Sequence, residues 1–247
     1  MNWQAYLLAF PVILYFFVFN YLPMVGIVMA FQDYKFTDGL FGSKWVGFAN
    51  FIKFFTNPSF FTILRNTLVI SLLGIVVGFP ASIVFALLVN EIHNKLFKRV
   101  VQTISYMPYF ISMVVICGLI IDFVSSNGII TNLLVFFGME RQNMLTNPRY
   151  FWAINLFSDL WQSLGYSSII YLAAISNVNP ELYEAATIDG AGRFKKVWHI
   201  TIPGIMPYII TMLILRIGML MYVAHDKILL LYNPSIYGTA DVISTHV

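Results

Sequence analysis

Asp159 and Arg216 are ionisable residues inside long apolar stretches, where binding chemistry is expected first. Charged groups within a membrane are costly and usually face the bundle interior or water. Asp159 is followed by Trp161 and Tyr166. Aromatic rings stack on sugar rings and a carboxylate accepts hydrogen bonds from hydroxyls, so these three residues are candidates for a substrate path. A buried polar contact between helices is the preferred interpretation of Asp159, with Arg216 as a candidate partner for it.

The segment 179–203 is the longest polar-bearing stretch in the C-terminal half, and it separates two apolar runs. Asn179 can cap a helix N-terminus. Asp189 and Gly190 form a stop-and-turn signal, because glycine accepts a positive φ without steric cost. A second helical phase follows, and Pro203 stands near the next apolar run. We predict two short helices that meet at Gly190 and lie on the membrane surface.

Composition places the chain among membrane proteins. Its 247 residues are 59% hydrophobic and 10% charged, whereas soluble domains carry about 25% charged residues. The net charge of +3 gives no indication of a nucleic-acid partner. The single cysteine, Cys117, and the four separated histidines offer no metal-ligand spacing. Catalytic groupings and phosphate-binding loops are also missing from the sequence, so we expect neither an enzyme nor a cofactor.

Five apolar runs approach or exceed the ~20 residues that a membrane-spanning helix needs. They are residues 6–31, 66–90, 100–121, 150–176 and 202–224. A cleaved signal peptide is the rival interpretation of the first run, but a basic start and a small-residue cleavage site are lacking. We therefore predict an all-α integral membrane protein, a polytopic helical bundle with five transmembrane helices. Residues 1–62 would hold the first helix and an extracytoplasmic loop, and residues 63–247 the main transmembrane domain.

Acids and small residues follow one another in a specific order within 179–203. They are Glu184, Ala185, Ala186, Asp189, Gly190 and Ala191, and Pro203 follows them. This order resembles the EAA loop of ABC importer permeases. The whole chain resembles the carbohydrate-uptake branch of the type I importers. An amphipathic turn between two membrane helices is the alternative interpretation of this segment.

The resemblance implies a function and a set of partners. The loop 179–203 would couple the chain to separate ABC ATPase subunits on the cytoplasmic side, a placement that the density of basic residues in 91–99 and 177–203 also favours. A second permease subunit, identical or different, and an extracytoplasmic substrate-binding protein would complete the assembly in membrane lipid. The expected location is the bacterial cytoplasmic membrane, with several passes. The expected cargo is an oligosaccharide or a polysaccharide fragment.

The family core has six membrane helices, and five are predicted here. Residues 225–247 contain no further apolar run of spanning length, and residues 241–247 look like the loop that precedes a last helix. The chain is therefore expected to be a C-terminal truncation or a shortened paralogue. Two other classes stay open. An ion-coupled secondary transporter would show internal repeats and several acids within its spans. A non-transporting membrane scaffold would suit a missing sixth helix.

Overall fold

The structure is a computed structural model that describes residues 3–223 and 225–246. Contacts between Cα atoms divide the chain into two compact units, Met1–Phe60 and Phe61–Val247. The predicted end of the fifth span, Ala224, and the predicted end of the main domain, Val247, lie outside the described residues, as do Met1 and Asn2.

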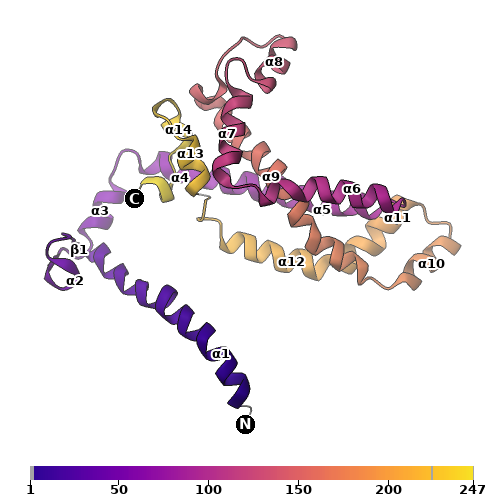
Figure 1. The fold of residues 1–247 in the computed structure, drawn as a ribbon, viewed down its shortest axis with the longest axis horizontal. Helices are drawn as coiled ribbons and strands as arrows, with labels where there is room; N and C mark the ends of the chain where they lie inside the picture. The colour runs from indigo at the N-terminus through magenta and orange to yellow at the C-terminus, as the bar shows by residue number, and fades with distance from the viewer. Residues whose placement is uncertain (1–2, 224, 247) are drawn as a thin grey trace. The chain divides into compact units, whose positions relative to one another are not determined.

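The first unit is a long helical run followed by a small cap. The run consists of α1 (Trp3–Phe16), η1 (Phe17–Tyr21) and η2 (Leu22–Phe31) (Figure 1). The cap contains β1 (Gln32–Asp33) paired antiparallel with β2 (Lys44–Trp45), together with α2 (Gly39–Gly42) and α3 (Ala49–Phe55). Its turn is held by Asn50, whose amide donates to the carbonyl oxygens of Ala30 and Gln32.

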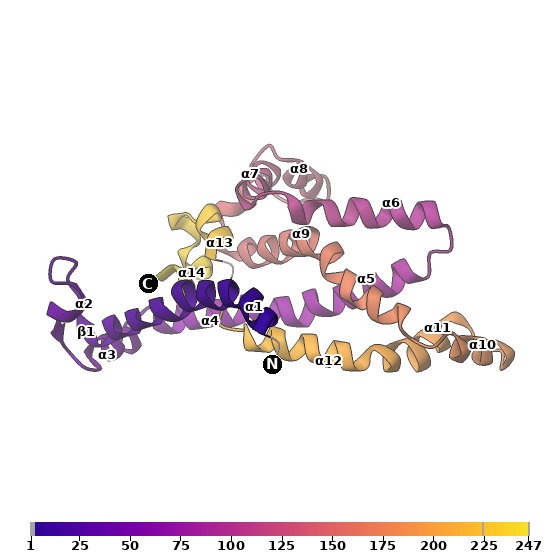
Figure 2. The same ribbon diagram turned by 60° about the horizontal axis from the view of Figure 1, so that its bottom comes forward.

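Four helical runs of the second unit lie side by side, with α9 (Pro148–Ser176) between the others (Figure 2). The other three are α4 (Phe60–Leu73) continued by η3 (Gly74–Gly78) and α5 (Phe79–Asn90), α6 (Lys95–Tyr106), and α12 (Ile202–Gly218). A Cβ atom on Gly165 of α9 would lie only 2.1 Å from the backbone oxygen of Ser105 on α6. Glycine is therefore required where these two backbones touch, as is common between membrane helices.

The predicted third span, 100–121, is not one helix. It consists of α6, η4 (Met107–Phe110) and α7 (Met113–Val124), with extended backbone at Ile111 and Ser112. Pro108 supplies no N–H to continue the α-helical hydrogen bonds, and the chain tightens into η4 before it leaves the helix. After a turn at 125–128, α8 (Ile129–Phe136) packs against α7.

Four helical stretches among the described residues are long and apolar enough to cross a membrane. They are Tyr6–Phe31, Phe60–Asn90, Met113–Phe136 and Arg193–Gly218. The third of these contains the turn between α7 and α8. Helix α9 has 29 residues but is less apolar, since Asn155, Ser158 and Asp159 face or border its buried side. The chain is thus an all-α membrane protein with several spans, and the number five stays a prediction.

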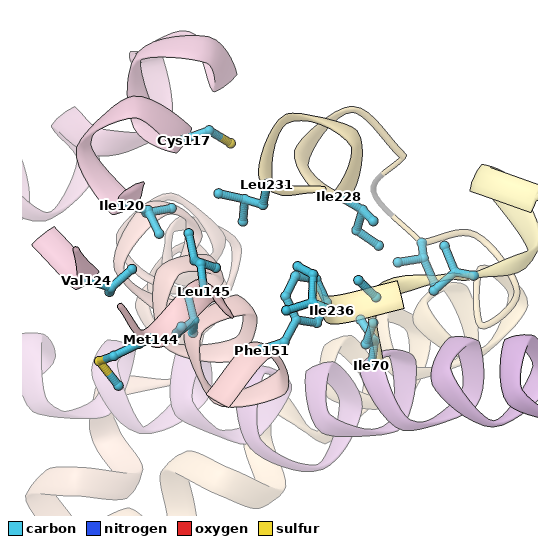
Figure 3. Close-up of a cluster of buried hydrophobic side chains, with 14 of the residues drawn as sticks. Ile70, Cys117, Ile120, Val124, Met144, Leu145, Phe151, Ile228, Leu231 and Ile236 are labelled. Carbon is cyan, nitrogen blue, oxygen red and sulfur yellow. The ribbon is translucent and has the colours of Figure 1, made fainter. Parts of the chain in front are cut away.

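Residues 225–246 fold back onto the bundle. Helices α13 (His225–Leu231), η7 (Pro234–Ile236), α14 (Tyr237–Ala240) and α15 (Ile243–His246) form this segment. Ile228, Leu231 and Ile236 are buried against side chains of α7, η5 (Met144–Thr146) and α9 (Figure 3). Val242, within the stretch 241–247 that was expected to be a loop, is buried in the same cluster, so the segment is part of the main hydrophobic core of the second unit.

Polar contacts also hold the 225–246 segment. The amide of Asn66 on α4 donates to the carbonyl oxygens of Gly238 and Asp241, and the indole of Trp152 on α9 donates to the oxygen of Thr239. Tyr232 donates to the carboxylate of Asp241 at 3.0 Å. Burial and then this hydrogen bond raise the pKa of Tyr232 to about 12, so the phenol stays a donor at neutral pH.

Each of three π-turns in the chain stands just before a proline. The turns η1, η3 and η6 (Val197–Thr201) each precede a proline by two residues, namely Pro23, Pro80 and Pro203. Proline lacks an N–H and its ring clashes with the carbonyl four residues earlier. In each case the residue before the proline donates to the carbonyl five residues back, as Ile202 does to Val197. The wider turn lets the helix continue through the proline.

Candidate functional site

Helix α10 (Pro180–Ile188) begins and ends at residues that the sequence predicts as a cap and a turn. Asn179 caps its start, where the side-chain oxygen accepts from the N–H of Glu181 at 3.0 Å. Gly190, with φ +73°, ends it. The N–H of Ala191 donates to Ala186 and that of Gly190 to Thr187, at 2.8 and 3.1 Å. This pair of bonds is a Schellman motif, which requires the left-handed residue that glycine supplies.

The second short helix predicted within 179–203 does not exist as a separate element. Helix α11 (Arg193–Lys196) passes through η6 into α12, and the run Arg193–Gly218 is helical over 26 residues. The prediction was wrong because it rested on Pro203 as the entry to a new helix. The π-turn before it accommodates the proline, so Pro203 lies inside the helical run.

Side-chain hydrogen bonds brace α10 against the start of this long run. Lys196 donates from Nζ to the hydroxyl of Thr187 at 2.7 Å, and Thr187 donates to the carbonyl of Tyr183. The hydroxyls of Tyr183 and Thr201 are 2.9 Å apart. Sequence reasoning missed this brace, although the spacing of Tyr183 and Thr187 by one helical turn is a signal that could have shown half of it.

The α10–α11 segment, residues 179–203, exposes both acids and large apolar side chains. Of the residues singled out from the sequence, Glu184, Ala185, Asp189, Gly190 and Pro203 are exposed, and Ala186 and Ala191 are half-buried. The side chains of Ile188 and Phe194 are 87% and 93% exposed, and Leu182 and Trp198 are also exposed. Exposed apolar side chains gathered in one short segment are typical of an interaction surface.

A cavity of about 710 Å³ lies among the helices of the second unit. Its walls come from α4, η3, α5, η4, α9 and α12. Asp159 and Tyr166 both line it, seven residues apart on one face of α9. The ring of Tyr166 stacks on Tyr109 with centroids 3.8 Å apart and planes within 3°. Trp161 is not part of the lining and is 47% exposed elsewhere on α9.

The partner of Asp159 is Lys227 of α13, not Arg216. The Nζ atom of Lys227 lies 2.5 Å from the Asp159 carboxylate and donates to the carbonyl of Asn155 at 3.0 Å. Asn155 in turn donates to the other carboxylate oxygen. Lys227 is fully buried, whereas the side chain of Asp159 is 46% exposed. Asp159 therefore takes part in a polar contact between helices and also faces the cavity.

Lys227 was missed in the sequence because it follows the last long apolar run and precedes a stretch of only five apolar residues, 228–232. Its burial depends on the folding of 225–246 onto α9, which no local pattern reveals. Arg216 lines the cavity from α12, so it is near the same space as Asp159 without being its partner.

Comparison with protein families identifies the fold. Residues 78–224 match the family described as "Binding-protein-dependent transport system inner membrane component", which covers more than half of the chain. The chain belongs to this family. It is 44% identical over 243 residues to the polygalacturonan/rhamnogalacturonan transport system permease protein YteP of Bacillus subtilis (strain 168), covering 98% of this permease and 76% of YteP.

Solved structures agree with the sequence relatives. A chain of a bacterial ABC transporter involved in the import of the acidic polysaccharide alginate matches with a TM-score of 0.90 and 41% identity, over 99% of this permease and 82% of that chain. The same kind of transporter in complex with an alginate pentasaccharide-bound periplasmic protein matches with a TM-score of 0.89. The protein is thus a membrane-spanning ABC importer permease and not itself an enzyme. These relatives do not favour a secondary transporter or a scaffold.

Proposed function

We propose that this permease carries an oligosaccharide or a polysaccharide fragment across the bacterial cytoplasmic membrane, with energy from separate ATPase subunits. The match to an alginate importer over 99% of the chain carries this proposal, since that transporter moves an acidic polysaccharide. The named substrates of YteP, polygalacturonan and rhamnogalacturonan, support it. The cavity beside the stacked pair Tyr109–Tyr166 offers the aromatic surface that a sugar ring requires.

The α10–α11 segment is the proposed contact with the ATPase. It lies at the end of the bundle where α5 connects to α6, and this end carries basic residues of both connections (Figures 1 and 2). Basic residues near the membrane favour a cytoplasmic location. The exposed Ile188 and Phe194 would enter an apolar cleft of the ATPase, and Glu184 and Asp189 would accept hydrogen bonds from it.

The long run Arg193–Gly218 connects the proposed contact with the cavity. Its first turn belongs to the α10–α11 segment, and Met212 and Arg216 near its end line the cavity. A helix rises 1.5 Å per residue, so Arg193 at its start and Arg216 beside the cavity are roughly 35 Å apart along one continuous element. Closure of the ATPase would move the segment and, through this helix, one wall of the cavity. The two states of the cavity would then open to opposite sides of the membrane.

Further partners follow from the same assignment. A second permease subunit would pair with this one, and an extracytoplasmic binding protein would deliver the sugar at the end of the bundle opposite α10. The neighbour that is complexed with a periplasmic protein supports the second of these. In this arrangement residues 1–62 hold the first membrane helix and an extracytoplasmic loop, and residues 63–247 hold the transmembrane domain.

Substituting Gly190 tests the coupling contact. Valine is strained at φ +73°, because a β-branched residue rarely adopts the left-handed region. We expect Gly190→Val to reduce the amount of ATPase that co-purifies with the permease at least about fivefold, since local strain costs on the order of 1–3 kcal/mol. Quantitative immunoblotting of the purified complex measures this.

Gly192→Val is the matched control. Gly192 is two residues away, has an extended backbone with φ −70° and ψ 168°, and has open space where a Cβ atom would lie. Valine favours such a backbone, so this variant should retain the ATPase. Equal retention by both variants, with the same amount of permease in the membrane, would contradict the proposed role of this segment.

A further inference from the structure

The cavity contains an uncompensated positive charge. Asp159 and Arg216 are the carboxylate and the guanidinium in its lining. The buried Lys227 neutralises Asp159. Within residues 3–223 and 225–246, the guanidinium of Arg216 has neither a hydrogen-bond partner nor an ion-pair partner. Arg216 is exposed and lines this cavity, so its positive charge attracts an anionic ligand more strongly than a neutral one.

The guanidinium of Arg216 lies beside the cavity, although Arg216 is near the C-terminal end of its own helix. Arg216 is in the last turn of α12, where a cation also benefits from the helix dipole. Its Nη2 atom, however, lies 3.3 Å from the place where a Cβ of Gly74 would be, across the cavity wall formed by η3. Gly74 thus leaves room for the guanidinium beside the open space.

The size of the cavity and the aromatic side chains in its lining also suit a sugar acid. A volume of about 710 Å³ is ample for a small oligosaccharide unit, since ligand sites commonly measure ~300–1,000 Å³. Trp152 and the stacked Tyr109–Tyr166 pair contribute aromatic surface to the lining. A planar guanidinium binds a carboxylate with two parallel hydrogen bonds. In a uronic acid, the sugar ring would stack on the aromatic side chains and the carboxylate would bind the guanidinium in the same cavity.

We propose that the sugar unit held in this cavity is a uronic acid and that Arg216 binds its carboxylate. This inference rests on the proposed function, because it concerns the saccharide that passes through the same cavity. Asp159, already paired with Lys227 and half-exposed to the cavity, accepts hydrogen bonds from sugar hydroxyls and does not attract the carboxylate. Arg216 is therefore the residue that separates acidic from neutral saccharides.

Uptake by the complete transporter tests the inference. The permease with its ATPase, partner permease and binding protein is reconstituted into vesicles of zwitterionic lipid alone, so that anionic headgroups cannot occupy Arg216. Uptake is compared for a uronic acid trisaccharide and for the same trisaccharide with its carboxyls reduced to alcohols. The ratio of the two rates is compared between the wild type, Arg216→Gln and Arg216→Lys. The binding protein contributes equally to all three ratios, so a change in the ratio reports the permease.

We expect Arg216→Gln to lower the ratio about tenfold or more, the effect of losing a charge-assisted hydrogen bond, with uptake of the neutral trisaccharide nearly unchanged. Arg216→Lys should retain an intermediate preference. An unchanged ratio in Arg216→Gln would overturn the inference. If Arg216→Gln abolishes uptake of both trisaccharides, so that no ratio can be measured, a preference kept by Arg216→Lys supports the inference, and a preference lost by it overturns the inference. A wild type that imports neither sugar would refute the proposed function, and one that imports only the neutral sugar would refute the inference alone.

Discussion

Gly165→Ala is expected to cause a large loss of folded protein although it adds a single methyl group. The added Cβ would lie 2.1 Å from the carbonyl oxygen of Ser105 and 2.4 Å from its carbonyl carbon. Both are backbone atoms and cannot rotate away, so α6 and α9 would have to separate. Overpacking costs about 1–3 kcal/mol and occasionally more, and the upper end applies here. The measurement is the thermal midpoint and the yield of monodisperse protein after solubilisation.

Gly118→Ala on α7 is the matched control, because nothing lies within 4 Å of the place where its Cβ would be. Alanine is favoured over glycine within a helix by about 1 kcal/mol. This variant should therefore be as stable as the wild type or slightly more so. A Gly165→Ala protein with the thermal midpoint of the wild type would show that α6 and α9 do not meet at this position.

Asp159→Asn is expected to destabilise the second unit more than Lys227→Met. The first variant leaves a fully buried ammonium without its counter-charge, and the second leaves a carboxylate that is 46% exposed. Removing one partner of a buried ion pair costs about 3–5 kcal/mol. We expect a value in this range for Asp159→Asn and a smaller loss for Lys227→Met, because the apolar methionine side chain fills much of the same space. Thermal unfolding of the purified protein measures both.

The double variant, Asp159→Asn with Lys227→Met, isolates the ion pair. Replacing both charges removes the unpaired ammonium, and such replacements are often neutral. The double variant should thus be more stable than Asp159→Asn alone. Losses that simply add, with the double variant less stable than either single one, would mean that the two side chains do not interact.

The parts of the fold that local chemistry controls were predictable. Helix α10 begins after the cap Asn179 and ends before Gly190, as predicted, because a cap and a left-handed turn depend on a few neighbouring residues. Long apolar runs indicated a helical membrane protein for the same reason. The break at Ile111 and Ser112 was not predicted, since apolar residues continue across it, although Pro108 three residues earlier is a local signal that could have indicated it.

The parts that depend on contacts distant in sequence were not predictable. Pro203 looks like a helix start, and its place inside a helix depends on the π-turn at Val197–Thr201. Lys227 looks like an exposed residue, and its burial against Asp159 joins positions 68 residues apart. Arg216 is recognisable as an ionisable group within a span, but Asp159 is not its partner, because Asp159 pairs with Lys227, 68 residues further along the chain.

Uptake of a labelled oligosaccharide into vesicles that contain the complete transporter tests the central claim most directly. We expect uptake that requires ATP on the side facing the α10–α11 segment and the binding protein with sugar on the opposite side. We also expect Gly190→Val to slow this uptake and Gly192→Val to leave it unchanged. Uptake that continues without ATP, or that an ion gradient drives in its place, would contradict the proposed mechanism.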